Sequence, residues 1–101
     1  VNMEDIFYFE YGQNRRVKLV ATTGTWYLSS SMKSLEKQME SYGFLVPHKS
    51  FLVNPRQILS FGAEIQMKNH EMIPIAKNRR KQVHEQISAY LHNSLNINWR
   101  D

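Results

Sequence analysis

The sequence has no cysteine among its 101 residues, and it has only four glycines and three prolines. The absence of cysteine excludes a disulfide framework and any cysteine-ligated metal site. No run of about 18 apolar residues is present, so no segment is predicted to span a membrane. The acidic start at residues 1–5 lacks the basic and apolar regions of a signal peptide. We therefore expect a cytoplasmic protein, and the valine at position 1 is expected either in a piece of a longer chain or after N-terminal processing.

What the sequence does contain is enough apolar material for one small core. Hydrophobic residues make up 42% of the chain and aromatic residues 12%. This length and composition predict a single domain over residues 1–101. The net charge is +4 and the isoelectric point is near 9.5. A basic balance favours polyanionic partners, although a merely basic surface would carry the same charge.

The apolar pattern predicts a mainly β fold with two short helices. Met32, Leu35, Met39 and Tyr42 recur at helical spacing, with Ser30 or Ser31 as the N-cap and Gly43 at the end. A second helix is predicted from about residue 78 on Val83, Ile87, Tyr90 and Leu91, and the tail 96–101 shows no period. The predicted strands are 5–11, 16–22, 25–29, 57–61, 63–67 and 72–75, the last an edge or a bulge because of its Pro74.

Basic residues gather at three places that are predicted to be loops. They are Asn14-Arg15-Arg16 with Lys18, then Lys49, then the run Lys77-Asn78-Arg79-Arg80-Lys81. Asn78 is predicted to cap the second helix, which would put three cations in a first turn where each is unfavourable by a few tenths of a kcal/mol. An anion site would explain that cost. A solvated charge run at an exposed helix end is the alternative.

An enzyme is not indicated, and neither a metal nor a cofactor is expected. The four histidines have no metal-ligand spacing with carboxylates, and His48, Lys49 and Ser50 are contiguous without a third catalytic group. The aromatic residues Phe7, Tyr8, Phe9, Tyr11, Trp26 and Tyr27 could form a platform for stacking bases. A small β core needs most of them, and that interpretation is preferred.

Several segments together resemble the LytTR DNA-binding domain. They are Phe44, His48-Lys49-Ser50-Phe51-Leu52-Val53-Asn54, Ile58, and Ile73-Pro74-Ile75-Ala76 before a basic helix start. The strands at 6–10 and 17–22 and the helix containing Ser34-Leu35-Glu36 match as well. The resemblance covers about residues 4 to 90, and the central run in this order is its most specific part.

The resemblance implies an elongated stack of small antiparallel sheets with two short helices. Such domains are transcription regulators in bacterial two-component systems, where they follow the receiver domain of a response regulator. They bind double-stranded promoter DNA, commonly as homodimers on direct repeats. Loops enter successive major grooves, and no recognition helix is used.

Carried over by position, the resemblance assigns ten DNA-binding residues. Asn14, Arg15 and Arg16 form the first reading loop, Lys77, Asn78, Arg79, Arg80 and Lys81 form the second, and Lys49 and Ser50 contact the backbone between them. The sequence departs from the family at Val46, where an arginine is common, and at Asn78, where an arginine might read a base. Whether Asn78 or Arg79 reads the base stays open.

The insert Pro-His-Lys-Ser at 47–50 is accordingly predicted to be a short exposed loop held toward a phosphate. His48 is assigned a structural hydrogen bond in preference to a DNA contact. Asn54 is expected to satisfy a local turn. The alternative function is a small β interaction module that binds polyanions or protein without reading bases.

Overall fold

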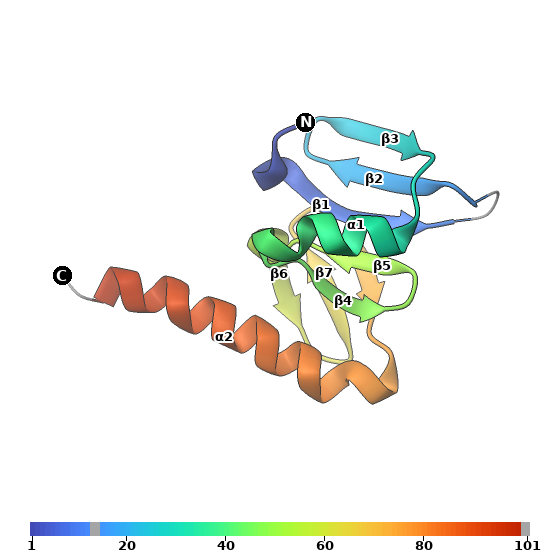
Figure 1. Cartoon of the computed structure of the whole chain (residues 1–101). Coiled ribbons are helices and arrows are strands. Elements are labelled where there is room, and N and C mark those ends of the chain that lie inside the picture. Colours follow the sequence, from blue (N-terminus) through green and yellow to red (C-terminus); the bar gives the residue numbers. More distant parts are fainter. Residues whose placement is uncertain (13–14, 100–101) are drawn as a thin grey trace.

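In a computed structural model the chain folds into two antiparallel sheets and two helices (Figure 1). The structure describes the backbone of residues 1–12 and 15–99, and the side chains of these residues as far as Asn93. The first sheet has the strand order β3-β2-β1-β5-β4 and the second the order β6-β7-β8. The predicted mainly β architecture is confirmed. The strands are β1 Ile6–Tyr11, β2 Val17–Ala21, β3 Gly24–Leu28, β4 Leu45–His48, β5 Phe51–Val53, β6 Ile58–Phe61, β7 Glu64–Met67 and β8 Met72–Pro74.

The two helices are α1 (Met32–Met39) and α2 (Arg80–Trp99). Short 3₁₀ turns flank them or join strands: η1 Met3–Asp5, η3 Glu40–Tyr42, η4 Pro55–Gln57 and η5 Lys77–Arg79. The molecule is elongated, with principal extents of 48 × 31 × 26 Å. None of the described helices is both long and apolar enough to cross a membrane.

The central strand β1 contributes to two cores, because its residues 6–9 are buried on both faces. One core lies under α1 and includes Phe9, Leu19, Leu35 and Leu52. The other lies between the first sheet, the second sheet and α2, and includes Phe7, Ile65, Val83 and Ile87. A strand buried on both faces is expected to be a continuous apolar run, which the Ile-Phe-Tyr-Phe stretch is.

Helix α1 begins where the sequence predicts but ends at Met39, and η3 carries the helical segment on to the predicted Gly43. The Oγ of Ser31 accepts a hydrogen bond from the N–H of Ser34 at 3.1 Å, as an N-cap should. After η3 the chain leaves the helical segment through Gly43, whose φ of 78° lies in the left-handed region that glycine adopts without strain.

The prediction of a four-residue exposed loop at 47–50 was wrong. Pro47 and His48 belong to β4, and only Lys49 and Ser50 form the turn. Pro47 is fully buried. Its missing N–H is tolerated in β4 because β4 is an edge strand. The Nδ1 of His48 accepts a hydrogen bond from the N–H of Ser50 at 3.1 Å, which is the structural role expected for that histidine.

Helix α2 differs from its prediction at both ends. Ala76 precedes η5 in an extended conformation and Asn78 lies within η5, so Asn78 is not the helix N-cap. The backbone continues helical to Trp99, beyond the point where the apolar period fades. Val83 and Ile87 are buried as predicted, but Leu91 is 45% exposed, because this part of α2 projects away from the sheets (Figure 1).

Tyr8 links the two sheets and gives a pH-dependent prediction. Its hydroxyl donates to Oε1 of Glu71 at 3.4 Å, and burial, with Glu71 and then Glu10, raises the pKa of Tyr8 to about 12. In the unfolded chain Tyr8 loses its proton near pH 10.0, so unfolding is favoured increasingly from that pH up to about 12. Urea unfolding across this range should show the loss in the wild type, whereas Tyr8→Phe should lack this component. Parallel curves for the two proteins would contradict the assignment.

Candidate nucleic-acid interface

Backbone hydrogen bonds hold the three basic segments together on one side of the molecule. The N–H of Tyr11, at the root of the first hairpin, donates to the carbonyl of Ser50 at 2.8 Å. The N–H of Ala76, just before η5, donates to the carbonyl of Pro47 at 2.9 Å. Segments that are distant in sequence therefore share one edge, on the right in Figure 1.

The first basic segment is the β1–β2 hairpin. Arg15 and Arg16 are exposed, and the N–H of Gly12 donates to the carbonyl of Arg16 at 2.9 Å to close the loop. Arg15 has a φ of 58°, which is uncommon for an arginine and carries a backbone cost. Asn14, the third residue predicted here, lies outside the described residues.

Lys18 differs from the two arginines. Its Nζ lies 3.6 Å from Oε1 of Glu10 on the neighbouring strand, so its charge is met within the sheet. Among the described residues this is the only ion pair between side chains. Arg15 and Arg16 thus remain available to an external anion, and Lys18 is less available than its place in the sequence indicated.

The middle segment is the two-residue turn between β4 and β5. Lys49 is exposed and Ser50 is half-buried. The hydrogen bond of the Ser50 N–H to His48 and that of its carbonyl to Tyr11 fix the turn from both sides. The Lys49 ammonium is therefore presented by a rigid support.

The third segment is η5 and the first residues of α2. Lys77, Asn78, Arg80 and Lys81 are exposed. Arg79 is half-buried, and its Nη1 donates to the carbonyl of Val46 at 3.0 Å. One of the five guanidinium donors of Arg79 is thereby used to attach this segment to β4.

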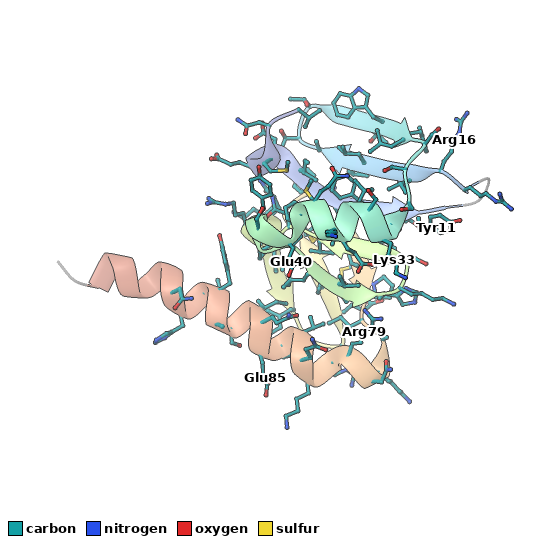
Figure 2. All side chains as sticks on the ribbon, viewed as in Figure 1. Tyr11, Arg16, Lys33, Glu40, Arg79 and Glu85 are labelled. Atoms are coloured by element: carbon teal, nitrogen blue, oxygen red, sulfur yellow. The ribbon has the colours of Figure 1, made fainter. Side chains whose placement is uncertain are left out.

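Apart from Lys18, the cations of the three segments have no carboxylate partner within the described part of the chain. Figure 2 shows Arg16, Tyr11 and Lys33 towards the right side of the molecule, with Arg79 below them near the start of α2. Seven charged residues make up this group, which we call the basic edge: Arg15, Arg16, Lys49, Lys77, Arg79, Arg80 and Lys81. Such an array attracts phosphate groups and can engage an extended polyanion.

Two hollows on the basic edge include residues that the sequence did not predict as functional. One, of about 450 Å³, is lined by Tyr11, Arg15, Arg16, Ser29, Ser30 and Ser31. The other, of about 440 Å³, is lined by Tyr11, Met32, Lys49 and Ser50. Ser30 and Ser31 were considered only as helix caps and Tyr11 only as a core aromatic or part of a platform. The triple serine before a helix was the one signal available.

The aromatic residues do not form one stacking platform. Phe7, Tyr8 and Phe9 are buried in the two cores. Trp26 and Tyr27 are 40% and 62% exposed, and as neighbours on strand β3 they face opposite sides of the sheet. Tyr11, 42% exposed, is the aromatic that lies on the basic edge.

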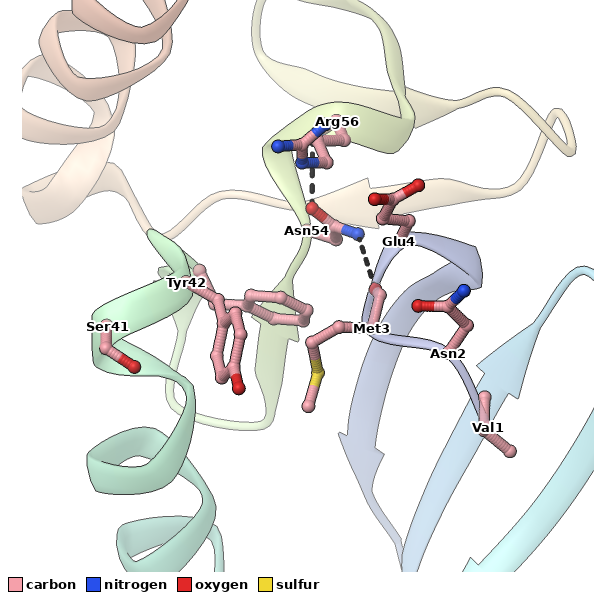
Figure 3. A pocket seen from close by; sticks show the side chains of 9 residues that line it. Val1, Asn2, Met3, Glu4, Ser41, Tyr42, Asn54 and Arg56 are labelled. Carbon is pink, nitrogen blue, oxygen red and sulfur yellow. Dashed lines mark hydrogen bonds between the residues drawn. The ribbon is translucent and has the colours of Figure 1, made fainter.

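A larger hollow of about 630 Å³ lies beside η1, η3 and η4, away from the three loops (Figure 3). Its charged side chains are Glu4 and Arg56, and the amide of Asn54 is used for structural hydrogen bonds. In the described part of the chain no three histidine or carboxylate side chains converge as a metal site would need. The basic edge is the better candidate for function.

Comparison with known proteins shows the family of the chain but does not locate its binding surface. A family model described as the LytTr DNA-binding domain matches residues 1–88. Among solved structures, the chain is similar to the LytTr DNA-binding domain of a protein described as a methyl-accepting/DNA response regulator from Bacillus cereus. That match has a TM-score of 0.75 and 19% identity, and covers 86% of this chain and 84% of the other. At this identity it shows a common fold. A search of curated proteins found no match.

Proposed function

Because the chain belongs to the LytTr DNA-binding domain family, we propose that it is the output domain of a bacterial transcriptional regulator and reads double-stranded promoter DNA through its loops. The observation that carries the proposal is the basic edge. Three loops from separate parts of the chain are hydrogen-bonded into one surface, and the seven cations of the basic edge have no carboxylate partner among the described residues. Recognition residues are commonly placed on loops that a rigid scaffold supports.

We assign base reading to the two outer loops. Arg15 and Arg16 are exposed on a hairpin, and an arginine fork suits the O6 and N7 atoms of guanine. In the other loop we assign the base contact to Asn78, which is exposed and suits adenine. Arg79 has one donor on the Val46 carbonyl, so we assign it to holding the loop and meeting a phosphate with its remaining donors.

The middle turn and the flanking cations would contact the DNA backbone. Lys49 and Ser50 lie between the two reading loops, where contacts with phosphates fix register without carrying sequence. Lys77, Arg80 and Lys81 would neutralise further phosphates beside Asn78. Each phosphate contact of this kind makes the measured affinity fall more steeply as the salt concentration rises.

The wider context is also part of the proposal. Two copies would occupy direct repeats in a promoter in the cytoplasm, and a receiver domain would control them in the intact protein. The solved LytTr domain of a described response regulator supports this context. The function is binding, with no catalytic residue, metal or cofactor assigned.

A selection experiment would test the proposal against a polyanion-binding module that reads no bases. The protein would select from a random duplex pool at about 150 mM salt, with heparin and single-stranded DNA as competitors. Enrichment of paired, evenly spaced repeats would support a promoter reader and give its operator. Enrichment of single sites would contradict the proposal that two copies bind direct repeats. Binding without enrichment of any sequence would support the polyanion-binding module instead.

A further inference from the structure

Tyr11 ends the central strand of the first sheet, next to both the hairpin and the Lys49–Ser50 turn. It is the last residue of β1, which lies between β2 and β5 in the sheet. It pairs with Val17 on one side and donates its N–H to the carbonyl of Ser50 on the other. The end of β1 therefore lies between the root of the reading hairpin and the Lys49–Ser50 turn.

Tyr11 is shared by the two hollows of the basic edge. It lines the hollow that contains Arg15 and Arg16, and it also lines the hollow that contains Lys49. Each hollow therefore has a tyrosine wall, at least one cation and at least one serine hydroxyl. Those are the groups from which phosphate contacts in protein–DNA complexes are made.

The hydroxyl of Tyr11 is available for a ligand. The residue is 42% exposed, and no hydrogen bond to its hydroxyl occurs within the described residues. Tyr8 on the same strand differs, because it is 3% exposed and its hydroxyl is bonded to Glu71. Tyr11 is also the last residue of β1, set back from the loop that carries Arg15 and Arg16.

We propose that the Tyr11 hydroxyl donates a hydrogen bond to a phosphate of the bound duplex, with the ring separating two backbone phosphates, one in each hollow. This inference rests on the proposed function and adds a residue to it. The contact is neutral and independent of sequence. It sets the position of the duplex between the arginines of the hairpin and Lys49.

Replacing Tyr11 with phenylalanine isolates the hydroxyl, because the ring and the net charge are kept. Affinity for the selected operator and for random duplex should both fall by about tenfold, the scale of a lost hydrogen bond to a charged group. The slope of log affinity against log salt should not change, since no cation is removed. The melting temperature should equal that of the wild type.

Two variants serve as references. Tyr27→Phe removes the hydroxyl of a 62% exposed tyrosine on β3 that lines neither hollow, and should leave affinity unchanged. Lys49→Ala should weaken binding and also reduce the salt slope by about one. Wild-type affinity for Tyr11→Phe would overturn the proposal, and so would a loss confined to the operator. Failure of the wild type to bind duplex DNA would instead overturn the proposed function.

Discussion

Replacing Arg16 with alanine is expected to weaken binding to the selected operator by about 1–3 kcal/mol and to reduce the preference for operator over random duplex. The guanidinium is exposed on a hairpin and has no carboxylate partner within the described residues, so its donors are free for a base edge. The Arg15→Ala variant should behave in the same way, and because alanine keeps a Cβ the backbone cost at φ 58° is unchanged. Affinity for both duplexes, measured by titration at fixed salt, gives the two quantities.

Lys49→Ala gives the contrasting result. Because Lys49 lies on the middle turn and is assigned to a phosphate, its loss should weaken operator and random duplex by the same factor. Arg56→Ala is the matched control, since it removes an exposed arginine within η4, which lines the hollow away from the basic edge. An Arg16→Ala variant that kept full specificity would refute our assignment of the hairpin as a reading loop.

Local signals in the sequence located the elements of this fold where the deciding interactions are local. Ser31 and Gly43 bound the first helical segment because capping and a left-handed residue act within a few positions. Pro74 restricts β8 to the edge of the second sheet for a similar reason. Strand pairing within hairpins follows from the same short-range pattern.

The errors arose where tertiary contacts decide. The sequence indicated a loop at Pro47, but Pro47 belongs to the edge strand β4. Its carbonyl accepts a hydrogen bond from the N–H of Ala76, which is distant in the sequence. Asn78 looked like an N-cap, but a 3₁₀ turn begins earlier and contains it. The extent of α2 could not be predicted from a period, because the C-terminal part of the helix projects away from the sheets (Figure 1).

The candidate site was predicted in part for the same reason. Runs of Arg and Lys are visible in sequence, so the three basic segments could be named. The pairing of Lys18 with Glu10 depends on the register of β1 and β2. The hydrogen bond of Arg79 to Val46 depends on the packing of η5 against β4. Tyr11 gains its place only when β2 and β5 flank β1. No periodicity in the sequence encodes that.

Asn54 lies at the end of β5 opposite to the basic edge. It directly follows β5, and the Lys49–Ser50 turn directly precedes that strand. It is 1% exposed and is the buried polar residue among those described. Its Nδ2 donates to the carbonyl of Ile6 at 2.8 Å. Figure 3 shows its other two bonds, in which Nδ2 donates to the carbonyl of Met3 at 3.3 Å and Oδ1 accepts from the N–H of Arg56 at 3.1 Å. The expected role in a local turn is confirmed, and two long-range bonds are added to it.

Asn54→Ala should therefore lower the free energy of unfolding by about 3 kcal/mol. The substitution removes three hydrogen bonds and leaves the buried carbonyl of Ile6 without this partner, a loss that costs more than the removal of an exposed bond. Urea unfolding would measure it. Asn69→Ala is the matched control, because Asn69 accepts one exposed bond from the N–H of Glu71 and should cost about 1 kcal/mol or less. Equal losses in the two variants would show that the long-range bonds of Asn54 contribute little, and that η1 is held to β5 by apolar packing alone.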